Sequence, residues 1–251
     1  MIKEITSANN PYIKDLYKLK EKKYRNLNKR FIIEGFHLVK EAYLKGVLKE
    51  VLFVYENDIK DINSSNINLI KVSIDVINKL SETTNPQSIM GICEIKDVSI
   101  DYQKYNKLLI LDGVNDPGNL GTLIRTALGF NIDLIVCSLD TVDIYNSKSI
   151  RATQGALFAL PIVYRDLNNE LDIIKKNNIK IVGSSLESKT SLSEIKKIDR
   201  YAIVLGNEAK GVKESTLEKT DINIIINTNS KLESLNVSVA GAIIMYELDK
   251  K

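Results

Sequence analysis

The sequence predicts an α/β protein in two domains, and three observations lead to this prediction. Short apolar runs rich in β-branched residues alternate with amphipathic segments along the 251 residues, which is the pattern of strands joined by helices. A polar stretch without a clear period, residues 96–107, interrupts this alternation. Beyond it the alternation resumes on a larger scale. We therefore expect an N-terminal domain at 1–97, a linker at 98–106 and a C-terminal domain at 107–251.

The N-terminal domain is predicted to be a small α/β sandwich. Its first helix lies within residues 11–30, where Pro11 occupies a tolerated first helical position and apolar residues recur close to helical spacing. Strands and helices then alternate, and polar loops are expected around 63–68 and at 81–88. The predicted strands are 31–33, 51–55, 69–72 and 89–95, and the later helices are 36–45 and 74–80.

The C-terminal domain is predicted to hold a parallel sheet. Apolar strands linked by helices imply a sheet covered on both faces, with ligand-binding loops at the carboxyl ends of the strands. The predicted strands are 108–111, 134–137, 179–182, 202–205 and 222–226, and the predicted helices are 120–130, 145–151, 167–176, 212–219 and 235–248.

Composition disfavours several classes of function. No run approaches the roughly 20 apolar residues needed to span a bilayer, and the first residues, MIKEITSANNPY, lack the apolar core of a signal peptide. We expect a cytoplasmic protein with no membrane partner. Cys93 and Cys137 lie far apart in apolar runs, and His37 is the only histidine. Neither a metal site nor a Ser-His-Asp hydrolase is therefore expected.

Positive charge gathers near the N-terminus. The net charge is only +3, but residues 1–50 hold twelve Lys and Arg against six Asp and Glu. One interpretation is an ordinary solvated helix face. The other is a surface that contacts RNA phosphates, with neighbouring tyrosines stacking on bases. This segment alone leaves both open. The basic residues concerned are Lys14, Lys18, Lys22, Lys23, Arg25, Lys29 and Arg30, and the tyrosines are Tyr12, Tyr17 and Tyr24.

Three polar loops follow predicted strands of the C-terminal domain and precede predicted helices. They lie within residues 111–127, 203–212 and 226–247, which read LDGVNDPGNLGTLIRTA, IVLGNEAKGV and INTNSKLESLNVSVAGAIIMYE. Helix N-termini leave N–H groups unpaired, so three such loops at one sheet edge predict a binding site. The glycines of the first loop do not form GxGxxG, and no Walker sequence occurs, which disfavours the two familiar phosphate-binding loops.

In order and spacing, these loops resemble the three sequence motifs of the SpoU/TrmH branch of the SPOUT RNA methyltransferases. The first motif matches NDPGNLGTLIRTA, the second matches IVLGNEAKGV and the third ends in ESLNVSVA. The segment RATQGALFALPI, residues 151–162, also resembles the family's connecting segment. The resemblance implies an α/β-knot fold, that is a deep trefoil knot, with S-adenosylmethionine (SAM) as cofactor and a homodimer. The N-terminal domain resembles the small substrate-binding domain of members that act on ribosomal RNA.

By matching positions, the resemblance also implies the site residues. The reaction centre would contain Asn119, Arg125, Glu208, Ser234 and Asn236, and SAM would be held by Leu205, Gly206, Ile226, Leu235 and Asn236. Methyl transfer to a ribose 2′-hydroxyl needs in-line positioning and loss of the hydroxyl proton. Because a guanidinium is a poor base, we interpret Arg125 as a clamp on phosphate that stabilises the forming alkoxide. Glu208 would orient its neighbours or relay the proton.

The chain departs from the family pattern at two places. Where the family commonly has Ile-Pro-Met followed by glycine two residues later, this chain has Ile226-Asn227-Thr228-Asn229-Ser230. Loss of proline and glycine changes the conformations open to the backbone, so the pocket wall is expected to differ. In the second motif Ala209 stands where glycine is frequent.

We therefore predict a SAM-dependent RNA ribose 2′-O-methyltransferase acting on 23S ribosomal RNA. Two alternatives stay open. The first is an RNA-binding module with little or no methyl transfer, which the altered third motif makes conceivable. The second is a methyltransferase with another target, such as transfer RNA or a base.

Overall fold

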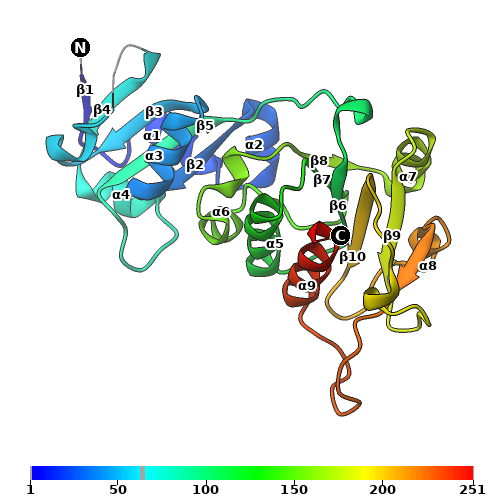
Figure 1. Cartoon of the computed structure of the whole chain (residues 1–251). Coiled ribbons are helices and arrows are strands. Elements are labelled where there is room, and N and C mark those ends of the chain that lie inside the picture. The colour runs from blue at the N-terminus through cyan, green and yellow to red at the C-terminus, as the bar shows by residue number, and fades with distance from the viewer. Residues whose placement is uncertain (1, 63–65, 251) are drawn as a thin grey trace. The chain divides into compact units, whose positions relative to one another are not determined.

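The computed structural model describes residues 2–62 and 66–250, drawn in colour in Figure 1. By their contacts they form two compact units. The N-terminal unit comprises Met1–Asp97 and Tyr145–Ala159, and the C-terminal unit comprises Val98–Ile144 and Leu160–Lys251. The boundary after residue 97 lies where the sequence predicts the linker, but residues 145–159 join the N-terminal unit, whereas the sequence placed them in the C-terminal domain. Residues 63–65 of the predicted polar loop lie outside the described part.

The N-terminal unit is built on a five-stranded sheet in the order β1-β4-β3-β5-β2. Strand β5 runs antiparallel to β2 and β3, while β4 runs parallel to β1 and β3. The strands are β1 (Lys3–Ile5), β2 (Arg30–Glu34), β3 (Leu48–Phe53), β4 (Asn68–Val72) and β5 (Ile89–Glu94). The helices are α1 (Pro11–Lys18), α2 (Lys22–Asn28), α3 (Phe36–Leu44), α4 (Ile74–Leu80) and α6 (Ser147–Thr153).

Apolar side chains cover both faces of this sheet. One core cluster joins α1 and α4 to the sheet through residues such as Ile13 and Ile77. The other joins α3 to the sheet and includes Ile150 of α6 and Leu157. The Phe31 ring lies 4.5 Å from the Tyr145 ring, centroid to centroid. Residues 145–159 therefore supply part of the core of the N-terminal unit.

The helix predicted within 11–30 is divided into α1 and α2. The turn between them is fixed by Arg25, which is buried and whose Nη1 donates to the carbonyls of Leu19 (2.8 Å) and Lys20 (2.6 Å). Helix α2 ends at Lys29, whose φ of 52° is left-handed. A charged side chain bonding locally to carbonyls is not visible in helical periodicity, which explains why the sequence predicts one helical segment.

The C-terminal unit contains a fully parallel six-stranded sheet, as the sequence predicts, in the order β11-β9-β10-β6-β7-β8. Its strands are β6 (Lys107–Asp112), β7 (Leu134–Ser138), β8 (Ile162–Arg165), β9 (Lys180–Ser184), β10 (Tyr201–Gly206) and β11 (Ile222–Ile224). Its helices are α5 (Pro117–Gly129), α7 (Leu167–Lys176), α8 (Glu214–Leu217) and α9 (Val237–Asp249). The α/β class is therefore confirmed, while β8 was not predicted.

Helices cover both faces of this sheet. Alternate residues of β6 and β10 point to a core that includes α7 side chains such as Leu171 and Ile174. On the other face α5 and α9 pack against each other (Figure 1), and a Cβ added at Gly241 would meet Leu123 and Leu205. Among the described residues, no helix is long and apolar enough to cross a membrane.

Candidate active site

The site lies at the carboxyl ends of two adjacent parallel strands, β6 and β10. From β6 the chain continues to β7 and β8 on one side, whereas β9 and β11 lie on the far side of β10. In an open parallel sheet, ligands bind in the crevice at such a reversal of strand order. The first predicted loop leaves β6 there and leads into α5, and the second leaves β10 beside it.

Glu208, in the second loop, bonds to the start of α5. Its Oε2 accepts from the backbone N–H of Asn115 and its Oε1 from that of Asp116, both at 3.1 Å. Oε1 also accepts from Nδ2 of Asn119 at 3.0 Å. Burial raises the pKa of Glu208, but these hydrogen bonds outweigh it and leave the pKa below its usual value. The carboxylate is therefore ionised and occupied as an acceptor.

Asn119 connects Glu208 to the third motif. Its Oδ1 accepts from Nδ2 of Asn236 at 3.0 Å, while its own Nδ2 donates to Glu208. Asn236 is the N-cap of α9, because its Oδ1 accepts from the N–H of Ser238 (2.9 Å) and of Val239 (3.4 Å). One chain of hydrogen bonds, Asn236 to Asn119 to Glu208, therefore joins all three predicted loops.

The second loop folds back on the end of β10. Asn207 and Gly211 exchange two backbone hydrogen bonds of 2.9 Å, and Asn207 Nδ2 donates to the Gly113 carbonyl at 2.9 Å. A Cβ at Gly206 would lie 2.1 Å from the Gly211 carbonyl carbon and from the Val212 nitrogen. Only glycine therefore fits at position 206.

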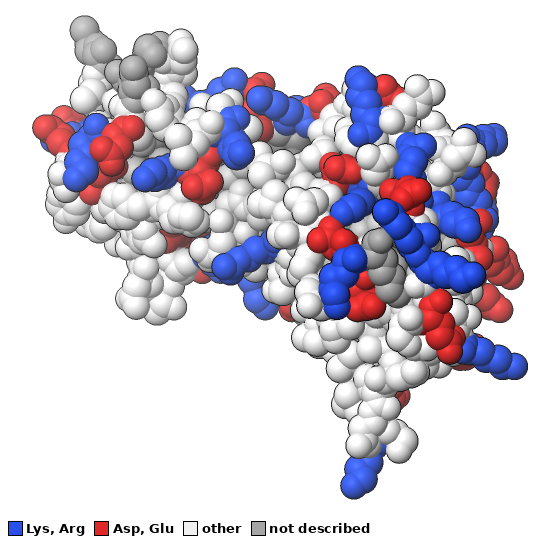
Figure 2. Space-filling model, viewed as in Figure 1, with Lys and Arg blue, Asp and Glu red and all other residues white. Residues whose placement is uncertain are grey.

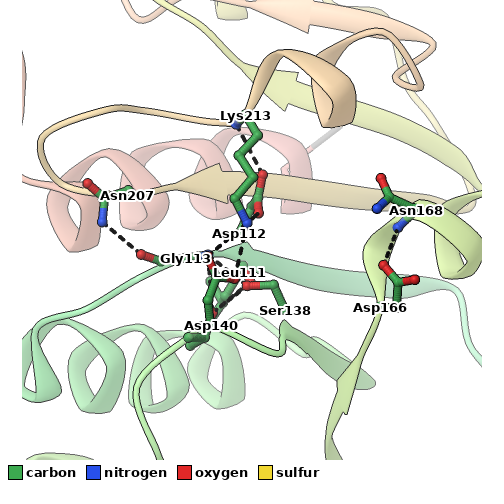
Figure 3. Close-up of polar contacts among 10 residues, drawn as sticks. Leu111, Asp112, Gly113, Ser138, Asp140, Asp166, Asn168, Asn207 and Lys213 are labelled. Carbon is green, nitrogen blue, oxygen red and sulfur yellow. Dashed lines mark hydrogen bonds and ion pairs between the residues drawn. The ribbon is translucent and has the colours of Figure 1, made fainter.

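An ion pair between an exposed lysine and a buried carboxylate lies beneath this loop (Figure 3). Asp112, at the end of β6, is 1% exposed, and its Oδ1 is 3.0 Å from Nζ of Lys213. The same Nζ bonds to both carboxylate oxygens of Asp140, at 2.9 and 3.1 Å. Burial lowers the pKa of Lys213, but the two carboxylates outweigh it and raise the pKa above its usual value. Hydrogen bonds from Ser138 and Lys213 lower the pKa of Asp140.

The third loop, residues 225–236, extends away from the sheet between β11 and α9 (Figure 1). Figure 2 shows this projection as mostly uncharged, with basic atoms at its tip. Within residues 66–250, the main chains of Ile226 and Leu235 make no hydrogen bond to another main-chain group. Their donors and acceptors are therefore available to a ligand.

Two predicted reaction-centre residues stand apart from the hydrogen-bonded chain. Arg125 is exposed on α5, and no hydrogen bond or ion pair ties it to a neighbour in the described part of the chain. Ser234 is exposed in the third loop and has no described hydrogen bond. Of the predicted cofactor residues, Leu205 and Gly206 are buried at the end of β10, and Ile226 and Leu235 are half-buried.

The predicted RNA-contacting residues differ in their availability. Lys14, Lys22 and Lys23 are exposed, and Lys22 also interacts with a neighbour. Lys18, Lys29 and Arg30 are exposed and pair with Asp15, Asp97 and Glu50 at 2.7, 2.9 and 3.1 Å. Arg25 must be corrected: its guanidinium is buried and holds the turn between α1 and α2, so it presents no charge to RNA. Tyr12 is also half-buried, and its hydroxyl donates to Glu50 at 2.5 Å.

Comparison with known proteins identifies the family. The model of the SpoU rRNA methylase family matches residues 106–246, more than half of the chain and all three loops. The chain belongs to the SpoU rRNA methylase family. A second model, the MRM3-like substrate binding domain, matches residues 10–91. The resemblance inferred from the three motifs is therefore confirmed for both parts of this SpoU family member.

Individual relatives agree with this assignment. The chain is 38% identical over 248 residues to the Bacillus subtilis (strain 168) 23S rRNA (guanosine(2553)-2′-O)-methyltransferase RlmP, covering 98% of this chain and 99% of that one. An AdoMet-bound rRNA methyltransferase from Sinorhizobium meliloti superposes with a TM-score of 0.88 at 29% identity, covering 99% and 98% of the two chains. A TrmH/SpoU tRNA-modifying enzyme from A. aeolicus matches only 59% of this chain and 78% of its own, with a TM-score of 0.52 and 26% identity.

The residues of this SpoU family member fit SAM. Gly206, having no Cβ, lets the second loop close on the end of β10, and the main chains of Ile226 and Leu235 offer donors and acceptors that no other main-chain group uses. The side chains of Leu205, Ile226 and Leu235 are apolar, and apolar side chains are suited to packing against the adenine ring of SAM. Among the described residues, no group of three His, Cys, Asp or Glu lies close enough to hold a metal ion.

Sequence reasoning overlooked Asp112 and Lys213. The signal for Asp112 was present, because it directly follows four apolar strand residues in LLILD, and a carboxylate there is buried only with a partner. Lys213 carries no comparable signal, since it lies 101 residues along the chain from that partner.

Proposed function

We propose that this protein transfers the methyl group of SAM to a ribose 2′-hydroxyl of 23S ribosomal RNA. The observation that carries the proposal is the hydrogen-bonded chain Asn236–Asn119–Glu208, which joins the three family motifs at one edge of the sheet. Similarity to RlmP over nearly the whole of both chains supports the ribosomal target. Such a target would place the protein in the cytoplasm with the ribosomes.

The site residues would act by orientation and charge. When bound, SAM would supply an electrophilic methyl group for transfer to the ribose oxygen, with its sulfur as the leaving group. Glu208 fixes the Asn119 amide, and Asn119 in turn fixes Asn236 at the start of α9. Positioned amides hold the reacting hydroxyl in line, which lowers the barrier mainly through orientation. Arg125, exposed on α5 and free of described partners, would clamp an RNA phosphate and stabilise the forming alkoxide.

The hydroxyl proton would leave to water. Glu208 is a weak base here because its pKa is lowered and its oxygens already accept three hydrogen bonds. An arginine guanidinium does not deprotonate in proteins. Both residues are exposed, so solvent reaches the centre. Of the two roles predicted for Glu208, orientation of its neighbours is thus the better supported.

The cofactor pocket would be formed by the ends of β10 and β11 and the third loop. Leu205, Gly206, Ile226, Leu235 and Asn236 would hold SAM there. The path of the chain supports the trefoil knot: β11 is an edge strand, yet α9 packs on β10 and α5. Tracing the chain from β11 to α9 in an experimental structure with SAM tests both parts of this proposal.

The N-terminal unit would bind the RNA. Lys14, Lys22 and Lys23 are exposed on α1 and α2, and Tyr17 is 46% exposed nearby in sequence, as a stacking platform requires. Lys18, Lys29 and Arg30 would have to exchange their carboxylate partners for phosphates. The salt dependence of RNA affinity tests this assignment, because each lysine that contacts phosphate adds about one unit to the slope.

A homodimer would form through α9. Val239, Ile243 and Tyr246 recur at helical spacing and are 48%, 38% and 51% exposed. Leu128 on the adjacent α5 is 41% exposed. A charge at the centre of this face, Ile243→Glu, should yield a monomer in sedimentation velocity. The matched control Leu186→Glu changes a residue that is 63% exposed elsewhere in the same unit, and it should leave the dimer intact.

The decisive experiment is methylation in vitro. Purified protein is incubated with tritiated SAM and with 23S rRNA or tRNA, each transcribed without modifications, and the methylated nucleotide is mapped. Label on a 23S ribose 2′-oxygen supports the proposal. The tRNA alternative has weaker support, because similarity to the tRNA-modifying enzyme covers only part of this chain, and label on tRNA would favour it. RNA binding without transfer would favour the binding-module alternative.

A further inference from the structure

The ion pair Asp112–Lys213, in which Asp112 is buried and the Lys213 side chain is 50% exposed, joins the end of β6 to the residue that follows the second loop (Figure 3). Lys213 makes two contacts with Asp112: its backbone N–H donates to Oδ2 at 3.1 Å, and its Nζ lies 3.0 Å from Oδ1 in an ion pair. Within residues 66–250, Oδ1 of Asp112 has no hydrogen-bond partner, so the Lys213 ammonium is what neutralises it. An ion pair with one member fully buried depends on its partner much more than a surface pair does.

The second loop is therefore anchored at both ends. At its start, Asn207 Nδ2 donates to the Gly113 carbonyl. At its end, Lys213 bonds to Asp112 and also to Asp140, which follows β7. Gly113 is itself fixed, because its N–H donates to the hydroxyls of Ser138 (2.9 Å) and Thr141 (3.2 Å).

Glu208 lies between these two anchors. It is exposed, and its carboxylate reaches the N–H groups of Asn115 and Asp116 and the Asn119 amide only if the loop keeps this position. Lys213 itself is in none of these contacts, so any effect on the reaction centre passes through the loop.

We infer that Lys213 is a positioning residue for methyl transfer: paired with Asp112 and Asp140, it holds the second loop so that Glu208 orients Asn119. This inference rests on the proposed function. Lys213 touches neither the reaction-centre amides nor the residues assigned to SAM. Its loss should misplace Glu208 without removing a group that contacts substrate.

The test compares Lys213→Met, Lys213→Arg and the control Lys219→Met. Lys219 also bonds to a carboxylate of the C-terminal unit, Asp172, at 2.6 Å, but it holds no part of the second loop. Lys213→Met should lower kcat about 10- to 100-fold while KM for RNA changes less than about threefold. Lys213→Arg keeps the charge and should recover most of the loss, and Lys219→Met should keep the wild-type kcat.

A double mutant separates positioning from general destabilisation. If Lys213 acts through Glu208, Lys213→Met combined with Glu208→Gln should be no slower than Glu208→Gln alone. Rate losses that multiply, or an equal loss in Lys219→Met, would overturn the inference.

Amide hydrogen exchange gives a readout that needs no activity. Lys213→Met should increase exchange at Asn115 and Asp116, whose N–H groups bond to Glu208, and Lys219→Met should leave it unchanged. If the wild type methylates no RNA, the proposed function fails, yet this exchange result still decides the role of Lys213. Unchanged protection in Lys213→Met would refute it.

Discussion

The contribution of the Glu208 carboxylate to the stability of the folded protein depends on pH. Hydrogen bonds from Asn119 and two backbone N–H groups hold its pKa below the ordinary 4.5, against the opposing effect of burial. The unfolded chain therefore takes up the proton first as the pH falls. The stabilisation from Glu208 is complete above about pH 4.5 and is lost as the pH drops through the lower, folded-state value.

We predict that Glu208→Gln removes this pH dependence. Glutamine does not titrate, so the difference in Tm between the wild type and Glu208→Gln should be greatest near neutral pH and should shrink as the pH falls below about 4.5. Thermal unfolding followed by circular dichroism at a series of pH values measures this difference in Tm. A difference in Tm that grows on acidification would contradict the assigned hydrogen bonds.

Gly206 is required by a close approach of backbone. A methyl group there would lie 2.1–2.2 Å from main-chain atoms of Gly211 and Val212, so the second loop would have to move. We predict that Gly206→Ala costs about 3 kcal/mol of stability, at the upper end for overpacking, and abolishes SAM binding. Gly129→Ala is the matched control, because nothing lies within 4 Å of its added Cβ. Denaturant unfolding measures the stability of the two variants, and calorimetry measures their affinity for SAM. If Gly206→Ala and Gly129→Ala have equal stability and equal affinity, the second loop moves aside without cost.

At the scale of elements, Asn236 has two roles that can be separated. As the N-cap of α9 it accepts from the N–H of Ser238 and Val239, and as a donor it holds Asn119. We predict that Asn236→Ala lowers stability by about 1 kcal/mol, the usual cost of a lost cap, and also lowers methyl transfer at least tenfold.

The cap of α7 offers the control for this prediction. Asp166 accepts from the N–H of Asn168 at 3.1 Å and belongs to none of the three motif loops. Asp166→Ala should match Asn236→Ala in Tm but keep full activity. If Asp166→Ala loses as much activity, the effect of Asn236→Ala is one of stability alone.

The elements differ in how far the sequence could predict them. The parallel sheet followed from apolar runs separated by helices. The C-terminal helix followed from a change from polar to buried helical residues, but its predicted start at residue 235 lies before the N-cap, Asn236, that the structure shows. Strand β8 was missed because it is four residues long and directly follows Pro161. The break between α1 and α2 was missed because it depends on Arg25 bonding to carbonyls, which leaves no mark in hydrophobic periodicity.

The residues of the site also divide into those that the sequence could predict and those that it could not. The resemblance to the family motifs indicated Asn119, Glu208 and Asn236 as site residues, and the structure joins these three side chains by hydrogen bonds. The pairing of Asp112 with Lys213 requires β6 to lie beside β10, and this strand order is decided by the whole sheet. Contacts of that kind are set by topology, so no local pattern predicts them.

At the scale of the whole molecule, residues 145–159 belong in sequence to the family's catalytic part but in contacts to the N-terminal unit. Leu157 and Ile150 lie in a core cluster with residues of β2 and α3. His37 Nε2 also lies 3.1 Å from the Gln154 carbonyl oxygen. The N-terminal unit is therefore completed by a segment that the chain supplies only after β7.

We predict that Leu157→Ala weakens the N-terminal unit. Removing a buried leucine side chain costs about 2–5 kcal/mol, and Leu157 is 7% exposed. In hydrogen exchange, Leu157→Ala should reduce protection in β2 and leave β6 unchanged. Leu171→Ala, which leaves a cavity in the core of the C-terminal unit, should reduce protection in β6 and leave β2 unchanged. If Leu157→Ala instead lowered protection in β6 and spared β2, residues 145–159 would belong to the C-terminal unit, as the sequence predicted.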